Sequence, residues 1–331
     1  MNKLNTYIIL ITILLTTKIF GVQRICKKGE IINKLNCKLG SVVQFRSNGS
    51  LYSFVLDHDQ EVQGILSKGD HSVIFHENGK LQYSGLSKEH LIQGIPFGEG
   101  SMIHLNANGS LKGVYLRKDQ EIQDTPSIAE SWVSFHENGK LESANLSKNV
   151  KIQGIYFNKR TEVNYDEEGK LKYVFLSKNV EIQGIPAKRG DNIYFHWNGM
   201  LKEVKLSRDK EIQGNYFPKG TKIEFHYNAK LKEVHPSKNI IIQGIPCKSG
   251  RVINFYENGK LYAGVLSKNK KIFDIEFEEG TRIFLNEEGK LNSAVLSVDK
   301  EIEGINFKKG DFIFFNSKGK IETEIPERVM K

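Results

Sequence analysis

Apolar and polar positions recur with a period of thirty residues from residue 27 to residue 326. Each unit contains three short apolar stretches that are separated by polar segments. The clearest marker is one apolar, usually aromatic, residue per unit: Phe45, Phe75, Leu105, Phe135, Tyr165, Phe195, Phe225, Phe255, Leu285 and Phe315. A period of this size without insertions is typical of a repeat array, in which each unit buries its apolar face against its neighbours.

The pattern inside a unit predicts β-strands, because no stretch shows the 3.6-residue period of a helix. The first stretch carries a β-branched residue such as Ile32 or Val62, and the second alternates apolar and polar residues, as from Val73 to Phe75. Such alternation places apolar side chains on one face of a strand. We therefore expect an all-β chain with a single repeat array over residues 22–326, ten units over 27–326 and a C-terminal tail over 327–331.

The dipeptide Asn-Gly separates the second and third stretches in six units and predicts a hairpin there. A type I′ turn needs positive φ at both central residues, which Asn tolerates and Gly adopts freely. The six pairs begin at Asn48, Asn78, Asn108, Asn138, Asn198 and Asn258. In the seventh unit Ala229 replaces the glycine, and we expect a looser turn because alanine is strained at positive φ.

The segments Phe75-His-Glu-Asn-Gly-Lys-Leu81 and Phe255-Tyr-Glu-Asn-Gly-Lys-Leu261 resemble the MORN-repeat variant family. In that family, bacterial antitoxin-like proteins carry arrays of tyrosine-glutamate-asparagine-glycine-lysine-leucine repeats. The resemblance covers nearly all of residues 27–326 and implies an elongated, twisted antiparallel sheet of successive hairpins. The units are larger here than in the family by an extra segment, typified by residues 95–100, which leaves the strand path open.

Two architectures accommodate three apolar stretches in each unit. A three-sided parallel β-solenoid stacks equivalent residues about 4.8 Å apart, whereas antiparallel hairpins place them about twice as far apart. The solenoid brings like charges together in a basic column: Lys88, Lys118, Lys148, Lys178, Arg208, Lys238 and Lys268. We therefore favour the MORN-like hairpin array, with the extra segment as a bulge or strap that does not join the sheet as a full strand.

The N-terminus resembles a secretory signal peptide, since Lys3 precedes an apolar run over residues 7–15 and a polar stretch that ends near Gly21. The apolar run is shorter than the roughly 20 residues that span a bilayer. We therefore predict a signal peptide over residues 1–21 and an exported protein that is secreted, periplasmic or on the cell surface. An uncleaved N-terminal anchor is the alternative.

The formal net charge of +9 arises from 48 basic and 39 acidic residues that are interleaved along the chain. This balance permits weak, salt-sensitive binding to anionic surfaces and predicts no nucleic-acid partner.

The chain has three cysteines. Cys26 and Cys37 are close enough in sequence to form a disulfide that staples the N-terminal end of the array. Cys247 lies seven units further on, and a disulfide requires Cα atoms within about 7 Å. Because Cys247 occupies the column of Phe97 and Phe157, we interpret it as a small buried hydrophobic residue.

The candidate contact residues are glutamines of a fixed column, Gln153, Gln183 and Gln213, and two tryptophans. Amides at a fixed spacing can hydrogen-bond a repetitive partner such as a glycan, exposed backbone, or one another. An exposed Trp132 would anchor a partner, whereas a buried one would fill the space of a missing phenylalanine. Trp197 is the second tryptophan.

No catalytic, cofactor-binding or metal-binding constellation with a recognised spacing is found in the sequence. Histidines follow the aromatic position in four units, without a convergent ligand set: His76, His136, His196 and His226. The longest break in the repeat covers residues 124–132. An enzyme that uses Glu130 and Trp132 is therefore a hypothesis of a different class.

We expect an exported, non-enzymatic β-repeat protein that acts as a binding or spacer scaffold at the cell envelope or outside the cell, for an unknown protein or glycan partner. A second hypothesis is a docking module for anionic lipid or polyanionic glycan, whose binding weakens as the salt concentration rises. A third is an intracellular, antitoxin-like interaction protein, if the leader is not a signal.

Overall fold

The computed structural model describes residues 20–316 and 318–322, and these residues form β-strands and turns. The predicted fold class is confirmed, because successive hairpins pair side by side in antiparallel sheet. The alternative of a parallel solenoid is wrong. Among the described residues, no helix is long and apolar enough to cross a membrane. The predicted signal peptide lies outside the described residues except for Phe20 and Gly21, and the predicted tail lies wholly outside them.

A full repeat contributes four strands, as the segment from residue 90 to residue 115 illustrates. β10 (His90–Ile92) and β11 (Ile95–Phe97) form a separate two-stranded hairpin, and β12 (Met102–Leu105) and β13 (Leu111–Tyr115) form a long hairpin of the main sheet. The extra segment therefore stays out of the main sheet, as expected. It is a strand of a short hairpin, however, and not the bulge or strap that we predicted.

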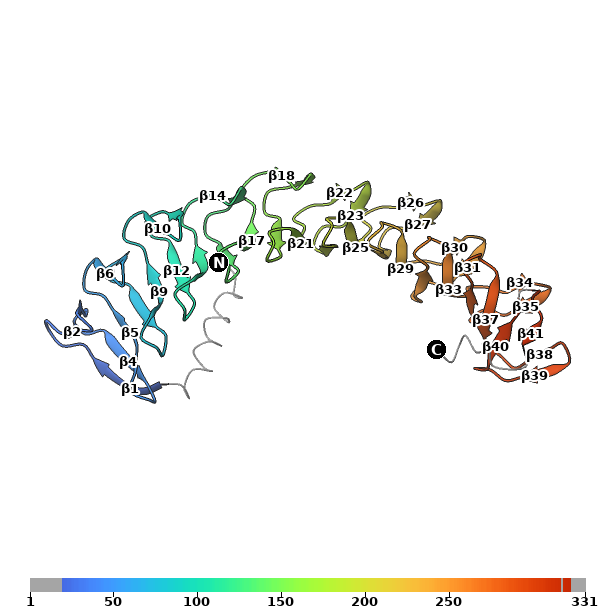
Figure 1. Cartoon of the computed structure of the whole chain (residues 1–331), viewed down its shortest axis with the longest axis horizontal. Coiled ribbons are helices and arrows are strands. Elements are labelled where there is room, and N and C mark those ends of the chain that lie inside the picture. The colour runs from blue at the N-terminus through green and yellow to red at the C-terminus, as the bar shows by residue number, and fades with distance from the viewer. Residues whose placement is uncertain (1–19, 317, 323–331) are drawn as a thin grey trace. The chain divides into compact units, whose positions relative to one another are not determined.

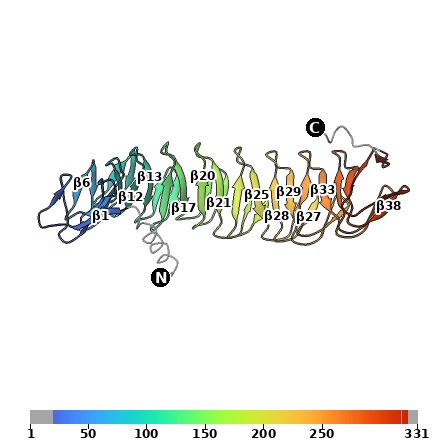
Figure 2. The ribbon, with the colours of Figure 1, turned by 90° about the horizontal axis from the view of Figure 1, so that it is seen from below.

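The described residues fall into two compact units. The first extends to Lys148 and includes Asn164–Gly169, and the second contains Asn149–Val163 and the residues from Lys170 onward. In each unit the short hairpins lie along one side of the row of long strands (Figures 1 and 2). An even number of long strands per repeat lets every repeat run in the same direction.

The other long strands of the first unit are β1 (Phe20–Ile25), β4 (Val42–Arg46), β5 (Leu51–Val55), β8 (Ser72–Phe75), β9 (Leu81–Gly85), β16 (Trp132–Phe135) and β17 (Leu141–Asn145). β20 (Glu162–Tyr165) has residues in both units. The long strands of the second unit are β21 (Leu171–Phe175), β24 (Asn192–Phe195), β25 (Leu201–Lys205), β28 (Lys222–Phe225), β29 (Leu231–His235), β32 (Ile253–Phe255), β33 (Leu261–Val265), β36 (Arg282–Leu285), β37 (Leu291–Val295), β40 (Phe312–Phe315) and β41 (Ile321–Glu322).

The other short hairpins of the first unit are β2 (Ile31–Ile32) with β3 (Leu35–Asn36), β6 (Gln60–Val62) with β7 (Ile65–Ser67), and β14 (Gln120–Ile122) with β15 (Thr125–Ser127). Those of the second unit are β18 (Val150–Ile152) with β19 (Ile155–Phe157), β22 (Val180–Ile182) with β23 (Ile185–Ala187), β26 (Lys210–Ile212) with β27 (Asn215–Phe217), β30 (Ile240–Ile242) with β31 (Ile245–Cys247), β34 (Lys270–Ile272) with β35 (Ile275–Phe277), and β38 (Lys300–Ile302) with β39 (Ile305–Phe307).

The core contains the inward-facing residues of the short and the long hairpins. At one core position, large and small side chains alternate from repeat to repeat. From β7 to β35, the last position of the second short strand reads Ser67, Phe97, Ser127, Phe157, Ala187, Phe217, Cys247 and Phe277, all of them buried. The alternation ends there, because β39 closes on Phe307, which is only half-buried. Where this residue is small, the short hairpin forms a backbone bridge to the end of a long strand, as between Ala187 and Leu206 or between Cys247 and Leu266. Two kinds of repeat therefore alternate between Ser67 and Phe277, and over this range the structural period is sixty residues.

The type I′ turn predicted at the Asn-Gly positions is wrong, and that turn type occurs instead at Gln-Gly, for which we predicted no turn. Gln93 and Gly94 both have positive φ, 51° and 81°, in the two-residue loop between β10 and β11, so Gln-Gly forms the type I′ turn. At the Asn-Gly positions only the glycine has positive φ, as at Gly79 with 78°. There the amide of Gly79 donates to the carbonyl of His76 at 3.0 Å and the pairing shifts by one residue. This is a type I turn followed by a glycine bulge.

The predicted loosening at Ala229 is also wrong. Ala229 adopts a φ of 63°, and its amide donates to the carbonyl of His226 at 2.9 Å. His226 in turn donates to the carbonyl of Lys230 at 2.8 Å, as in the turns that contain glycine. Alanine therefore accepts the left-handed conformation here with the same hydrogen bonds.

Candidate functional site: a groove between two short hairpins

The glutamine column bonds to the backbone of its own repeat. The side-chain amide of Gln183 donates to the carbonyl of Gly199 at 2.8 Å, and its carbonyl accepts from the amide of Leu201 at 2.9 Å. Gln213 makes the same pair of bonds to Ala229 and Leu231, and Gln153 accepts from Leu171 at 3.0 Å. Each glutamine thus ties the short hairpin to the turn of the long one.

The histidine column and the asparagine of the Asn-Gly turn link neighbouring repeats in the same way. The Nε2 atom of His196 lies 2.8 Å from the carbonyl oxygen of Phe225 in the next repeat, and His76 contacts Leu105 at 2.9 Å. The side chain of Asn198 donates to the carbonyl of Tyr227 at 2.9 Å. In the part of the chain that the structure describes, no group of three His, Cys, Asp or Glu side chains is arranged to hold a metal ion.

The two tryptophans are both exposed but lie in different places. Trp132 begins β16, is 46% exposed and packs edge-on against Tyr115 with ring centroids 5.8 Å apart. Trp197 lies in the turn after β24 and is 72% exposed, with the Lys170 amine 5.7 Å from its ring. Trp132 therefore does not fill the position of the missing phenylalanine, which the buried Ser127 occupies.

The cysteines are placed as the sequence suggested. Cys26 and Cys37 form a disulfide with their Cα atoms 6.2 Å apart. Cys247 is free and fully buried, and burial raises the pKa of its thiol to about 12. A thiol with so high a pKa is protonated at neutral pH and is a poor nucleophile.

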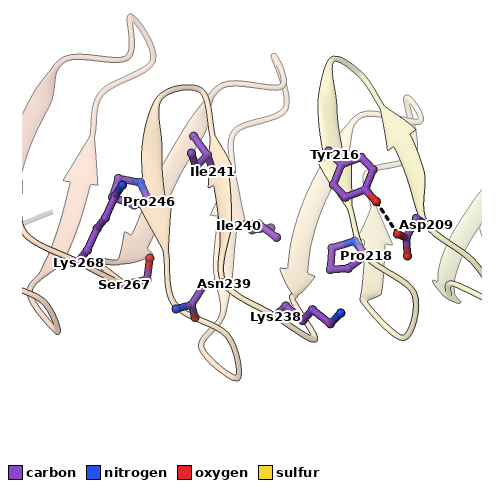
Figure 3. A pocket seen from close by; sticks show the side chains of 10 residues that line it. All are labelled: Asp209, Tyr216, Pro218, Lys238, Asn239, Ile240, Ile241, Pro246, Ser267 and Lys268. Carbon is purple, nitrogen blue, oxygen red and sulfur yellow. Dashed lines mark hydrogen bonds between the residues drawn. The ribbon is translucent and has the colours of Figure 1, made fainter.

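Once the regular polar columns are accounted for, a groove between two short hairpins of the second unit remains as the candidate site. It has a volume of about 590 Å³ and lies between the β26–β27 hairpin and the β30–β31 hairpin (Figure 3). Tyr216, 57% exposed, and the buried Pro218 form one wall. Ile240 faces them from the next hairpin, and Ile241 also lines the groove, from the other side of the same strand (Figure 3).

The Tyr216 ring is held in place by a hydrogen bond from its hydroxyl to the carboxylate of Asp209 (Figure 3). This bond, together with the Lys219 amide that donates to Asp209 at 2.7 Å, holds the pKa of the carboxyl below its ordinary value. The same hydrogen bond raises the pKa of the Tyr216 phenol. The ring is therefore a fixed apolar wall at neutral pH.

Cations and polar groups border this apolar groove. Lys238 extends toward the wall that contains Pro218, and Lys268 lies with Pro246 and Ser267 on the side of the following repeat (Figure 3). The segment 236–251, which includes β30 and β31, contains three cations and no acidic residue. The groove thus combines an aromatic ring, aliphatic side chains and a positive local charge.

The equivalent groove of the first unit has a different character. It has a volume of about 530 Å³ and lies 120 residues earlier in the sequence, where Pro96 stands in the place of Tyr216. Gln120 and Glu121 replace the two isoleucines, and Glu99 and Asp119 add further carboxylates to the lining. Grooves between short hairpins therefore belong to the repeat itself, whereas the apolar, basic lining is particular to the groove at Tyr216.

No protein-family model and no curated protein matches the chain. Among solved structures, the Tc holotoxin pore of Photorhabdus luminescens aligns with 10% identity over 86% of this chain and 15% of that one, with a TM-score of 0.16. A porin-like protein from Bacteroides uniformis aligns with 8% identity over 85% of this chain and 90% of that one, with a TM-score of 0.15. TM-scores this low carry no argument about fold or function.

Sequence reasoning did not identify the residues of this groove. The signal that could have revealed it is the alternation of phenylalanine and small residues in the column of Phe217, because it defines the sixty-residue period. Within that period Tyr156 and Tyr216 are equivalent, as are Pro186 and Pro246. Read with a period of thirty, these positions look merely variable.

Proposed function

We propose that the protein is an exported, non-enzymatic β-repeat scaffold that binds a partner at the cell envelope or outside the cell through grooves between its short hairpins. The observation that carries the proposal is a contrast between the repeated polar columns and the Tyr216 groove. The repeated glutamine, histidine and asparagine side chains bond internally, while the Tyr216 groove presents apolar and cationic groups to solvent.

The groove is suited to binding more than to catalysis. Its carboxylate, Asp209, is ionised and occupied by Tyr216 and Lys219, and its lining contains no cysteine or histidine. The one free thiol of the chain, Cys247, is buried beneath the hairpins with a raised pKa. Hydrolysis and group transfer need a general base with a pKa near neutrality and an accessible nucleophile.

Export rests on the N-terminal sequence and on the Cys26–Cys37 disulfide, since disulfides persist in oxidising compartments. The antiparallel hairpin sheet is the fold that the MORN-like hexapeptides imply, and we propose the relation to that family on those residues. If the protein were found in a reducing compartment, an antitoxin-like role inside the cell would be favoured instead.

Cell fractionation with N-terminal sequencing tests the proposal. We expect the protein in the exported fraction, with a mature N-terminus near Val22, and with the Cys26–Cys37 bond intact after alkylation of free thiols. A cytoplasmic protein that keeps Met1 and carries three reduced cysteines would overturn the proposed location.

A further inference from the structure

The groove at Tyr216 has the chemistry of a subsite for an acidic sugar. The exposed ring of Tyr216 offers a flat apolar face, against which the C–H face of a pyranose packs, and the bordering amines pair with carboxylate or sulfate groups. Among the described residues, Lys238 and Lys268 form no ion pair within 4 Å, so both amines can approach a ligand, although the charge of Lys238 also helps to lower the pKa of Asp209 in the same groove. Ile241, 62% exposed, extends the apolar wall.

Part of this set occurs a second time in this unit, sixty residues earlier, although Glu181 stands there in the place of Ile241 and Asn158 in the place of Pro218. Tyr156, 51% exposed, corresponds to Tyr216, Pro186 corresponds to Pro246, and Lys178 and Arg208 correspond to the two lysines. Arg208 is paired with Glu181 at 2.9 Å, which makes the earlier set the weaker of the two. The two sets are separated by two repeats, or about 19 Å at four strand spacings of about 4.8 Å.

A ligand that presents the same groups at regular intervals matches this arrangement better than a compact one. One repeat advances by about 9.6 Å along the sheet, which is close to the length of a disaccharide. A polysaccharide with an acidic group on every sugar, or on every second sugar, therefore presents a carboxylate at each member of the cationic column Lys178, Arg208, Lys238 and Lys268.

On these grounds we propose that the second unit binds an acidic polysaccharide along the edge formed by its short hairpins, with the Tyr216 groove as the principal subsite and the Tyr156 set as the second. This inference deepens the proposed function, on which it rests. It assigns the ring stacking to Tyr216 and Tyr156, and the pairing with carboxylates to Lys238, Lys268 and Lys178.

Calorimetric titration of the purified full chain with galacturonate oligosaccharides tests the inference, with neutral dextran and phosphatidylglycerol vesicles as separate ligands. We expect binding to the acidic oligosaccharides, no binding to dextran, and an affinity that falls as the salt concentration rises. Oligosaccharides long enough to reach both aromatic sets should bind more tightly than short ones, because the second contact becomes intramolecular.

The substitution Lys238→Gln should weaken binding roughly threefold, as for a solvent-exposed ion pair, and the triple variant Y216A/K238Q/K268Q about tenfold or more. Lys118→Gln, at the equivalent position of the acidic groove, and Tyr227→Ala, at a tyrosine that is 52% exposed in a long-hairpin turn, are the matched controls and should leave binding unchanged. All five residues are exposed, so the variants should keep the fold, which circular dichroism checks.

Three results overturn the inference: dextran that binds as tightly as the acidic sugar, a triple variant that binds like the unaltered chain, or vesicles that bind while the oligosaccharides do not. The failures remain distinguishable. A cytoplasmic protein refutes the proposed function through its location, whereas an exported protein with an unaffected triple variant refutes only the sugar-binding groove.

Discussion

Replacing one glutamine of the internal column offers a direct measure of what these side chains do. Gln183 has a φ of 50° and makes two hydrogen bonds, at 2.8 Å to Gly199 and at 2.9 Å from Leu201. A net hydrogen bond contributes about 1 kcal/mol, so Gln183→Ala should cost roughly 2 kcal/mol of local stability. Gln183→Gly loses the same bonds but relieves the left-handed strain, and should cost roughly 1 kcal/mol.

Hydrogen exchange at the amide of Leu201 is the appropriate assay, because repeat arrays unfold locally. The midpoint of a global unfolding transition averages over many repeats. A loss of about 2 kcal/mol corresponds to exchange that is roughly thirtyfold faster at this amide. Lys202→Ala, at an exposed neighbour on β25, is the control and should change little. An unchanged exchange rate at the Leu201 amide in Gln183→Ala would refute the structural role of the glutamine column. The glutamines would then again be candidates for ligand contacts.

Three further predictions concern the core, the cysteines and the groove. Phe217→Ala should destabilise its repeat by about 3–5 kcal/mol, because the ring is fully buried; a loss below 1 kcal/mol in thermal melting would contradict the packing of the short hairpin onto the sheet. Ellman titration should find no reactive thiol in the native protein and one after unfolding, since Cys247 is buried and Cys26 is bonded to Cys37; a reactive native thiol would count against this arrangement. Because the folded pKa of Asp209 is lowered from 3.8, its bond to Tyr216 should persist at neutral pH and be lost only as the pH falls through that lowered value. Tyr216→Phe should raise the pKa of Asp209, which NMR titration of the carboxyl measures, and an unshifted pKa would contradict the hydrogen bond.

The period of thirty and the alternation of apolar residues predicted an all-β repeat array. The column of like charges and the MORN-like hexapeptides were needed to favour hairpins over a parallel solenoid. These signals did not reveal that each repeat holds two hairpins, because the short strands contain only two or three residues each, as in β2 and β30, and alternate too briefly to be recognised. The turn type at the Asn-Gly positions was predicted wrongly for a different reason. Asn-Gly favours type I′ in isolation, but the bulge after β8 needs positive φ only at Gly79.

The functional residues were harder to predict because regularity is ambiguous in a repeat protein. A column such as Gln153, Gln183 and Gln213 looks like a ligand array, yet the position of a turn sixteen residues further on decides that it bonds to backbone. The groove residues are irregular in sequence. Tyr216 and Ile241 become neighbours across a groove only after two hairpins pack side by side.

The central claim is that the groove, and not the repeated polar columns, is the binding surface of the chain. Hydrogen-exchange mass spectrometry of the full chain with and without galacturonate oligosaccharide tests it most directly. We predict slower exchange in β26–β27 and β30–β31, with smaller effects in β18–β19 and none at the Asn-Gly turns. Protection confined to those turns or to the long strands would contradict it.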